Sequence, residues 1–135
     1  MDSGKLCFFF VIFEKTSGMA EHLEYGKMGE EKAVEYLIQR GYVILERNWR
    51  LKHKEIDIIC TDGDLLIVVE VKSRKTPEER PEELLDYRKR HNLLCAGEAY
   101  LKARGIDKEL RFDLVLVTGS GGKVEHIPGA ITIFD

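Results

Sequence analysis

The chain has 135 residues, enough for one domain that buries a core without metal or disulfide staples. Its 44% hydrophobic and 33% charged residues exclude a disordered chain, and its net charge of −3 excludes a general attraction to nucleic acid. Any binding of nucleic acid must therefore use local basic patches.

The N-terminal residues 1–22 differ from the rest, and we expect an extension of uncertain structure followed by one domain over residues 23–135. The apolar run from Leu6 to Phe13 is too short to span a bilayer, and it is followed by charges where a signal peptide needs small residues. The three cysteines are widely spaced and form no C-x-x-C pair. This pattern favours a reducing cytoplasm and predicts neither disulfides nor a zinc site.

The spacing of apolar residues predicts the element order α-β-β-β-α-β-β, starting near Gly26. Gly41 is a typical helix stop, Thr61 to Asp64 is a hairpin-type turn, and Gly119 to Gly122 closes a later strand. The predicted helices span residues 26–40 and 82–104, and the predicted strands span residues 42–49, 55–60, 65–71, 112–117 and 124–127. Successive strands favour antiparallel hairpins and the second helix allows a parallel crossover, so we expect an α/β fold with a mixed sheet flanked by helices.

Charged residues interrupt the strands where the pattern predicts burial. The strand from Leu65 to Val71 is almost wholly apolar until Glu70, and Lys72 lies on the same face because side chains alternate. Pairing across the short turn places Asp57 within about one residue pair of Glu70. Two close carboxylates repel unless a cation intervenes, so Mg²⁺ or Mn²⁺ is the expected ligand.

Lys72 beside such a site has a chemical role available to it, because an ammonium orients an attacking water and offsets charge at phosphorus. Asp57, Glu70 and Lys72 together meet the needs of phosphodiester hydrolysis. The plain alternatives stay open at this point: a strand-end salt bridge between Glu70 and Lys72, and an exposed Asp57.

Two further groups are candidates for the site. Glu30 shares a helix face with Ala33, Val34 and Leu37, although an acid in a first turn also simply complements the helix dipole. A basic run without an intervening acid is a candidate nucleic-acid contact or a solvated surface, and it contains Arg47, Arg50, Lys52, His53 and Lys54.

The spacing of Asp57 and Glu70-Val71-Lys72 resembles the D-x(n)-(D/E)-x-K signature of the restriction-endonuclease-like superfamily. From about Tyr25 to the C-terminus the chain resembles the YraN family of uncharacterised nuclease-like proteins. The segments that carry this likeness are Gly29-Glu30-x-x-Ala33, Tyr36-Leu37, Gly41-Tyr42, Asn48-Trp49-Arg50, Glu55-Ile56-Asp57, Val69-Glu70-Val71-Lys72-x-Arg74 and Arg111-Phe112-Asp113. Ile56 stands where the superfamily usually has proline, and Lys54 where the family usually has glycine.

The resemblance implies an αβββαβ core and a role for each matching residue. Asp57, Glu70 and the Val71 carbonyl would bind the metal, Lys72 would be the catalytic lysine, and Glu30 would be the helix acid found in resolvase-like members. Glu55 would support Asp57 from the same strand. The residues expected to contact nucleic acid are Arg47, Arg50, Lys52, Lys54, Arg74 and Lys89.

The sequence thus predicts a cytoplasmic, Mg²⁺- or Mn²⁺-dependent endonuclease that acts on nucleic acid, with DNA and branched or junction structures as the first substrates to consider. Two rival hypotheses stay open: a nucleic-acid-binding module that has the fold without turnover, and a structural protein whose charges form ion pairs. A homodimer would suit a two-stranded substrate, and no membrane association is expected.

Overall fold

The computed structural model describes residues 17–75 and 85–132, with side chains described from Glu24 onward. Within these ranges the chain forms two helices, α2 (Ser17–Gln39) and α3 (Tyr87–Arg104), and five strands. The strands are β1 (Val43–Leu51), β2 (Lys54–Asp62), β3 (Leu65–Arg74), β4 (Glu109–Thr118) and β5 (Lys123–Ile127). Most of the extension proposed for residues 1–22 lies outside the described residues, although α2 already begins at Ser17.

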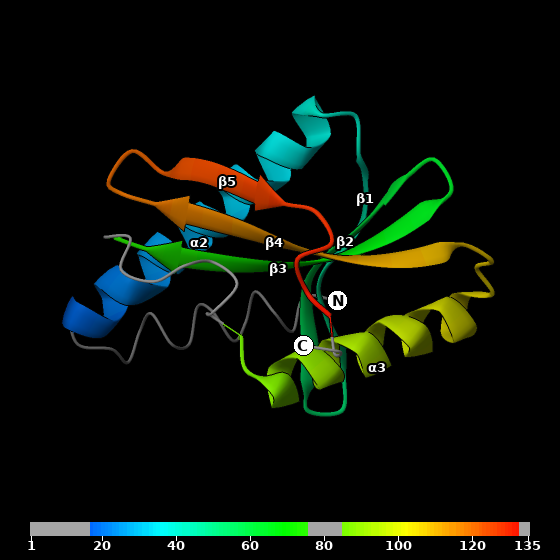
Figure 1. The fold of residues 1–135 in the computed structure, drawn as a ribbon. Coiled ribbons are helices and arrows are strands. Elements are labelled where there is room, and N and C mark those ends of the chain that lie inside the picture. The colour runs from blue at the N-terminus through cyan, green and yellow to red at the C-terminus, as the bar shows by residue number, and fades with distance from the viewer. Residues whose placement is uncertain (1–16, 76–84, 133–135) are drawn as a thin grey trace.

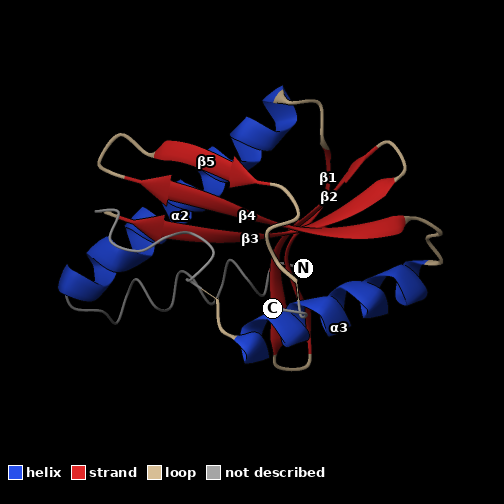
Figure 2. Cartoon of the chain, viewed as in Figure 1, coloured by secondary structure: helices blue, strands red, loops and turns tan. Residues whose placement is uncertain are grey.

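The strands form one sheet in the order β1-β2-β3-β4-β5. Neighbouring strands are antiparallel, except that β3 and β4 run parallel. The parallel pair is connected through α3, which crosses one face of the sheet while α2 covers the other (Figures 1 and 2). The predicted α/β fold, a mixed sheet with an αβββαβ core flanked by helices, is confirmed.

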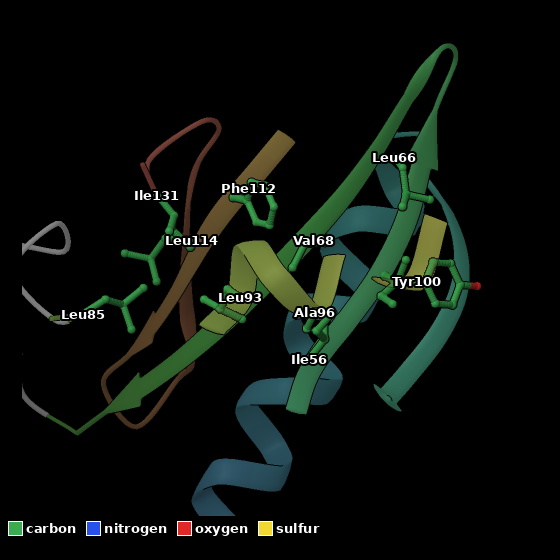
Figure 3. Packing of buried hydrophobic residues seen from close by; sticks show 11 residues of the cluster. Ile56, Leu66, Val68, Leu85, Leu93, Ala96, Tyr100, Phe112, Leu114 and Ile131 are labelled. Carbon is green, nitrogen blue, oxygen red and sulfur yellow. The ribbon is translucent and has the colours of Figure 1, made fainter. Parts of the chain in front are cut away.

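Each face of the sheet carries its own apolar core. On the α3 side, Leu93 and Ala96 pack against Val68 and Leu114, as Figure 3 shows. On the α2 side, the helix stripe predicted from the sequence is buried against the sheet and comprises Ala33, Val34 and Leu37. The central strand β3 is fully buried from Leu66 to Val69, because its alternating side chains enter both cores.

The ends of both helices differ from the prediction. α2 extends on its N-terminal side beyond the predicted start at Gly26. α3 begins at Tyr87 rather than at Glu82, because Asp86 has an extended backbone and its carboxylate accepts a hydrogen bond of 2.9 Å from the Lys89 N–H. Residues 82–84 of the predicted helix lie outside the described residues.

No helix within the described ranges is long and apolar enough to cross a membrane.

Candidate active site

The acidic pair lies where β2 and β3 separate. The last paired residues before the separation are Ile58 and Val69, so Asp57 and Glu70 are the next residues on the two strands. Beyond this point β2 continues with β1, and β3 continues with β4. The Asp57 Oδ2 atom accepts a hydrogen bond of 2.8 Å from the Val71 N–H, and this bond joins the diverging strands.

Glu70 is buried, with 4% of its surface exposed, and two lysines flank it. Its Oε2 atom lies 3.7 Å from the Lys72 Nζ and 3.6 Å from the Lys89 Nζ. Lys72 reaches it along β3, as predicted from alternation, and Lys89 reaches it from the first turn of α3. The other oxygen, Oε1, is buried and has no hydrogen-bond partner among the described residues.

Burial disfavours the ionised form of both carboxyl groups of the pair. Burial raises the pKa of Asp57 to about 8, and the nearby Glu70 adds to the increase, while the Val71 N–H opposes it. Burial also raises the pKa of Glu70, against the influence of Lys89 and Lys72. Asp57 therefore becomes fully ionised at neutral pH only when further positive charge arrives.

A second buried acid, Asp113 on β4, shows what a satisfied carboxylate in this fold looks like. Its Oδ1 accepts from Arg111 Nε and from the Gly129 N–H, both at 2.9 Å. Its Oδ2 contacts Arg111 Nη2 and His126 Nε2, both at 2.8 Å. Burial opposes ionisation, but the contacts with His126 and Arg111 hold the pKa of Asp113 below its usual value. Asp113 is therefore a structural acid, whereas Glu70 keeps an oxygen available for a ligand.

Glu30 approaches the pair from α2. Its Oε1 accepts hydrogen bonds from Arg47 Nη2 at 3.2 Å and from Asn48 Nδ2 at 3.1 Å. After burial and Glu70, its charge is a further cause of the raised pKa of Asp57. The preceding Gly29 permits this approach, since a Cβ there would collide with the Ser73 hydroxyl and lie 3.1 Å from its Cβ. Three acids from α2, β2 and β3 thus share one neighbourhood.

The remaining predicted residues lie around this centre or away from it. Arg47 also pairs with Glu31 at 3.0 Å, so its charge is engaged by acids. Glu55 faces Arg50 at 3.7 Å and acts on Asp57 only as the last of several causes of its raised pKa. Three further basic residues are exposed or partly exposed: Lys52, Lys54 and Arg74.

The donor set suits a hard divalent cation bound through few protein ligands. Within the described ranges, no three histidine, cysteine, aspartate or glutamate side chains gather closely enough to hold a metal ion. Asp57 and Glu70 can supply two carboxylates, which is the usual protein contribution to a Mg²⁺ site completed by water and substrate phosphate. The unpartnered Oε1 of Glu70 and the resistance of Asp57 to ionisation beside Glu70 both fit such an ion.

Sequence reasoning missed two features of the site. Asn48 was noticed only as part of a family motif, and its bond to Glu30 needed the path of β1 to be known. The direct contact of Lys89 with Glu70 was also missed, because the way in which a helix packs on a strand cannot be predicted from the sequence of either segment.

Comparison with known proteins gives one family match. Residues 29–117 match the model of a family described as "Uncharacterised protein family UPF0102". The matched stretch begins at Gly29 and includes Glu30, Asp57, Glu70 and Lys72, so the whole candidate site lies inside it.

Curated relatives match over nearly their entire length. A protein of Bacteroides thetaiotaomicron is 44% identical over 83% of this chain and 95% of its own. A protein of Christiangramia forsetii is 43% identical over 86% of this chain and 100% of its own. A protein of Persephonella marina is 41% identical over 80% of this chain and 93% of its own. Each is described only as a UPF0102 protein.

Proposed function

We propose that this chain, which belongs to the uncharacterised protein family UPF0102, is a divalent-metal-dependent nuclease. Membership confirms the resemblance to the YraN family found in the sequence. The observation that carries the proposal is the pair of half-buried Asp57 and buried Glu70 at the separation of β2 and β3, with an unpartnered Glu70 oxygen and two lysines beside it.

The residues divide the work of phosphodiester hydrolysis between them. Asp57 and Glu70 would hold Mg²⁺ or Mn²⁺, with the Val71 carbonyl as a third ligand. Such an ion, when bound, would supply a water molecule of lowered pKa and positive charge for the phosphate. Val71 also fixes Asp57 through its N–H, so the carboxylate keeps its direction as the ion arrives.

The two lysines supply positive charge next to these ligands. The Lys72 ammonium, on the same strand face as Glu70, would orient the attacking water and contact the phosphate as negative charge develops. Lys89 is more exposed, with 41% of its side chain accessible, and would bind a phosphate oxygen of the entering substrate. Glu30 would accept a hydrogen bond from water on the α2 side.

We propose DNA as the first substrate to examine, including branched and junction structures, and the cytoplasm as the location. The protein's net charge is negative, so substrate contact would depend on the basic residues near the site. Arg47 and Arg50 contact carboxylates in this structure, so they would have to exchange an acid for a phosphate.

The test is a cleavage assay on supercoiled, single-stranded and four-way-junction DNA with Mg²⁺ or Mn²⁺, and with a chelator as blank. We expect cleavage by the wild type, and a loss of about 10²-fold or more in Glu70→Gln and Lys72→Met. Exposed residues of α3 give matched controls, Glu98→Gln and Lys102→Met, which should cleave at the wild-type rate.

Three results would count against a nuclease at this site. Substrates that stay intact in every reaction would show that the protein does not cleave them. Salt-sensitive DNA binding that survives Glu70→Gln and Lys72→Met would identify a nucleic-acid-binding module instead. Equal cleavage by wild type and both site variants would point to a contaminating enzyme.

A further inference from the structure

Asn48 has a backbone conformation that is unusual inside a strand. Its φ is 54°, in the left-handed region, where asparagine is tolerated better than most residues other than glycine. Of the described residues other than glycine, only Lys52 shares a positive φ, and Lys52 lies in the turn between β1 and β2. A strained residue in mid-strand beside a candidate site asks for a functional explanation.

The left-handed residue interchanges the two faces of β1. Arg47 contacts Glu30 on α2, whereas Trp49, two residues later, packs edge-on against Tyr100 of α3. In a regular strand these two residues would face the same helix. Asn48 is the position at which β1 rolls over, and the pairing with β2 continues across it without a shift in register.

The partner strand β2 changes faces at the matching position. Arg47 pairs with Ile58 and Trp49 pairs with Ile56, so Asn48 lies opposite Asp57. Ile58 belongs to the core on the α2 side and Ile56 to the core on the α3 side. Asp57 therefore sits where the hairpin rolls over, beside the point at which β2 leaves β3.

Because the backbone rolls over at Asn48, the side chain of this residue reaches α2. Its Nδ2 donates to Glu30 Oε1 at 3.1 Å, and Arg47 Nη2 donates to the same oxygen at 3.2 Å. Two donors from consecutive residues hold one carboxylate oxygen, and consecutive residues share a side only because of the left-handed conformation. The Glu30 side chain is thereby fixed, with 19% of it exposed.

We propose that Asn48 is a positioning residue, whose left-handed backbone and amide together hold Glu30 toward Asp57. This inference rests on the proposed nuclease function. Asn48 touches neither the substrate nor the ion and acts through Glu30. Asparagine is suited to the task because it combines tolerance of a positive φ with an uncharged donor.

Substitutions can separate the backbone from the amide. Asn48→Gly keeps the left-handed conformation and removes the donor, whereas Asn48→Asp keeps the shape and turns the donor into a carboxylate facing Glu30. Asp64→Gly is the matched control, because it places glycine at an exposed position in the β2–β3 turn, at the other end of that hairpin from Asp57. None of the three variants adds a Cβ to a residue that lacks one.

The kinetic readout is the division between kcat and KM on a DNA substrate. We expect kcat to fall about 10-fold or more in Asn48→Gly and further in Asn48→Asp, with KM and Mn²⁺ affinity within about twofold of wild type. Asp64→Gly should keep the wild-type kcat. A wild-type kcat in Asn48→Gly would overturn the assignment, and so would an equal loss in Asp64→Gly.

A crystal structure of Asn48→Gly provides a readout that needs no activity. We expect the Glu30 carboxylate to move away from the position it has in the wild type, while the pairing of β1 with β2 is retained. An unmoved Glu30 overturns it. If wild-type protein fails to cleave nucleic acid, the nuclease proposal fails by itself, and the position of Glu30 in this structure still decides the role of Asn48.

Discussion

Asp57 Oδ2 accepts a 2.8 Å hydrogen bond from the Val71 N–H, at the position where β2 and β3 stop pairing. A side chain thus takes the place of the next backbone contact between the strands. The bond fixes the direction of a carboxylate that burial alone would make costly. The same separation of strands gives Glu70 a buried oxygen that no other described group satisfies.

The raised pKa of Asp57 makes the metal-free protein sensitive to alkaline pH. A carboxyl whose pKa is about 8 in the folded state and about 4 when unfolded binds more protons in the folded protein between these values. Stability should therefore fall as pH rises from about 4 to about 8. Asp57→Asn keeps an oxygen to accept from Val71 and removes the titration.

We expect Asp57→Asn to raise the melting temperature of the chelator-treated protein by roughly 5 °C or more at pH 8, and by much less at pH 4. Thermal unfolding followed by circular dichroism at both pH values measures this. Asp62→Asn, on the exposed end of β2, is the control and should leave the pH profile unchanged. A variant less stable than wild type at pH 8 would contradict the assigned burial.

The contact of α2 with β3 depends on Gly29, and Gly26 in the same helix gives an internal control. A Cβ at position 29 would collide with Ser73, whereas a Cβ at position 26 meets nothing within 4 Å. Gly26→Ala should stabilise the protein by about 0.5–1 kcal/mol through helix propensity. Gly29→Ala should destabilise it by about 1–3 kcal/mol.

Urea unfolding of the two glycine variants checks this prediction. Because Ser73 must move to admit the new methyl group, Ser73→Gly in the Gly29→Ala background should recover part of the loss. Similar stabilisation by both alanines would show that α2 does not approach β3 as closely as described.

The Asp113 network should matter for stability and not for the reaction. Asp113→Asn leaves an amide facing Arg111 and His126, which are themselves donors, so we expect a loss of about 3–5 kcal/mol. The pKa of Asp113 is lowered on folding, so its contribution is present above the unfolded value near 4 and disappears as pH falls below it. The deficit of the variant should therefore shrink in acid.

Chemical denaturation at pH 7 and at pH 3 measures this deficit. Under conditions where the variant is folded, its rate per folded molecule in a cleavage assay should match wild type. An equal deficit at both pH values would mean that the paired, ionised form of Asp113 is not what stabilises the fold.

Much of the fold could be predicted because its signals are local. Ala33, Val34 and Leu37 recur at helical spacing and are buried, and the turn at Gly63 fixes the register that brings Asp57 beside Glu70. The start of α3 was placed too early, because charged residues before Asp86 are compatible with a helix until a cap is recognised.

The rest of the site depends on contacts between residues that are far apart in the sequence. The roll of β1 at Asn48 depends on Arg47 and Trp49 facing different helices, and no single segment encodes that choice. Likewise, the basic run is a candidate nucleic-acid contact or a solvated surface, and its sequence does not indicate that Arg47 pairs with Glu30 and Glu31 of a separate helix.

The central claim is that Asp57 and Glu70 share one divalent ion. Its most direct test is the anomalous scattering of Mn²⁺ soaked into crystals near pH 8, close to the pKa of Asp57, where loss of its proton no longer opposes binding strongly. We predict a peak about 2.1 Å from a carboxylate oxygen of each residue, absent in Glu70→Gln. Mn²⁺ bound only elsewhere, or no peak beside a well-ordered Asp57–Glu70 pair, would contradict the account.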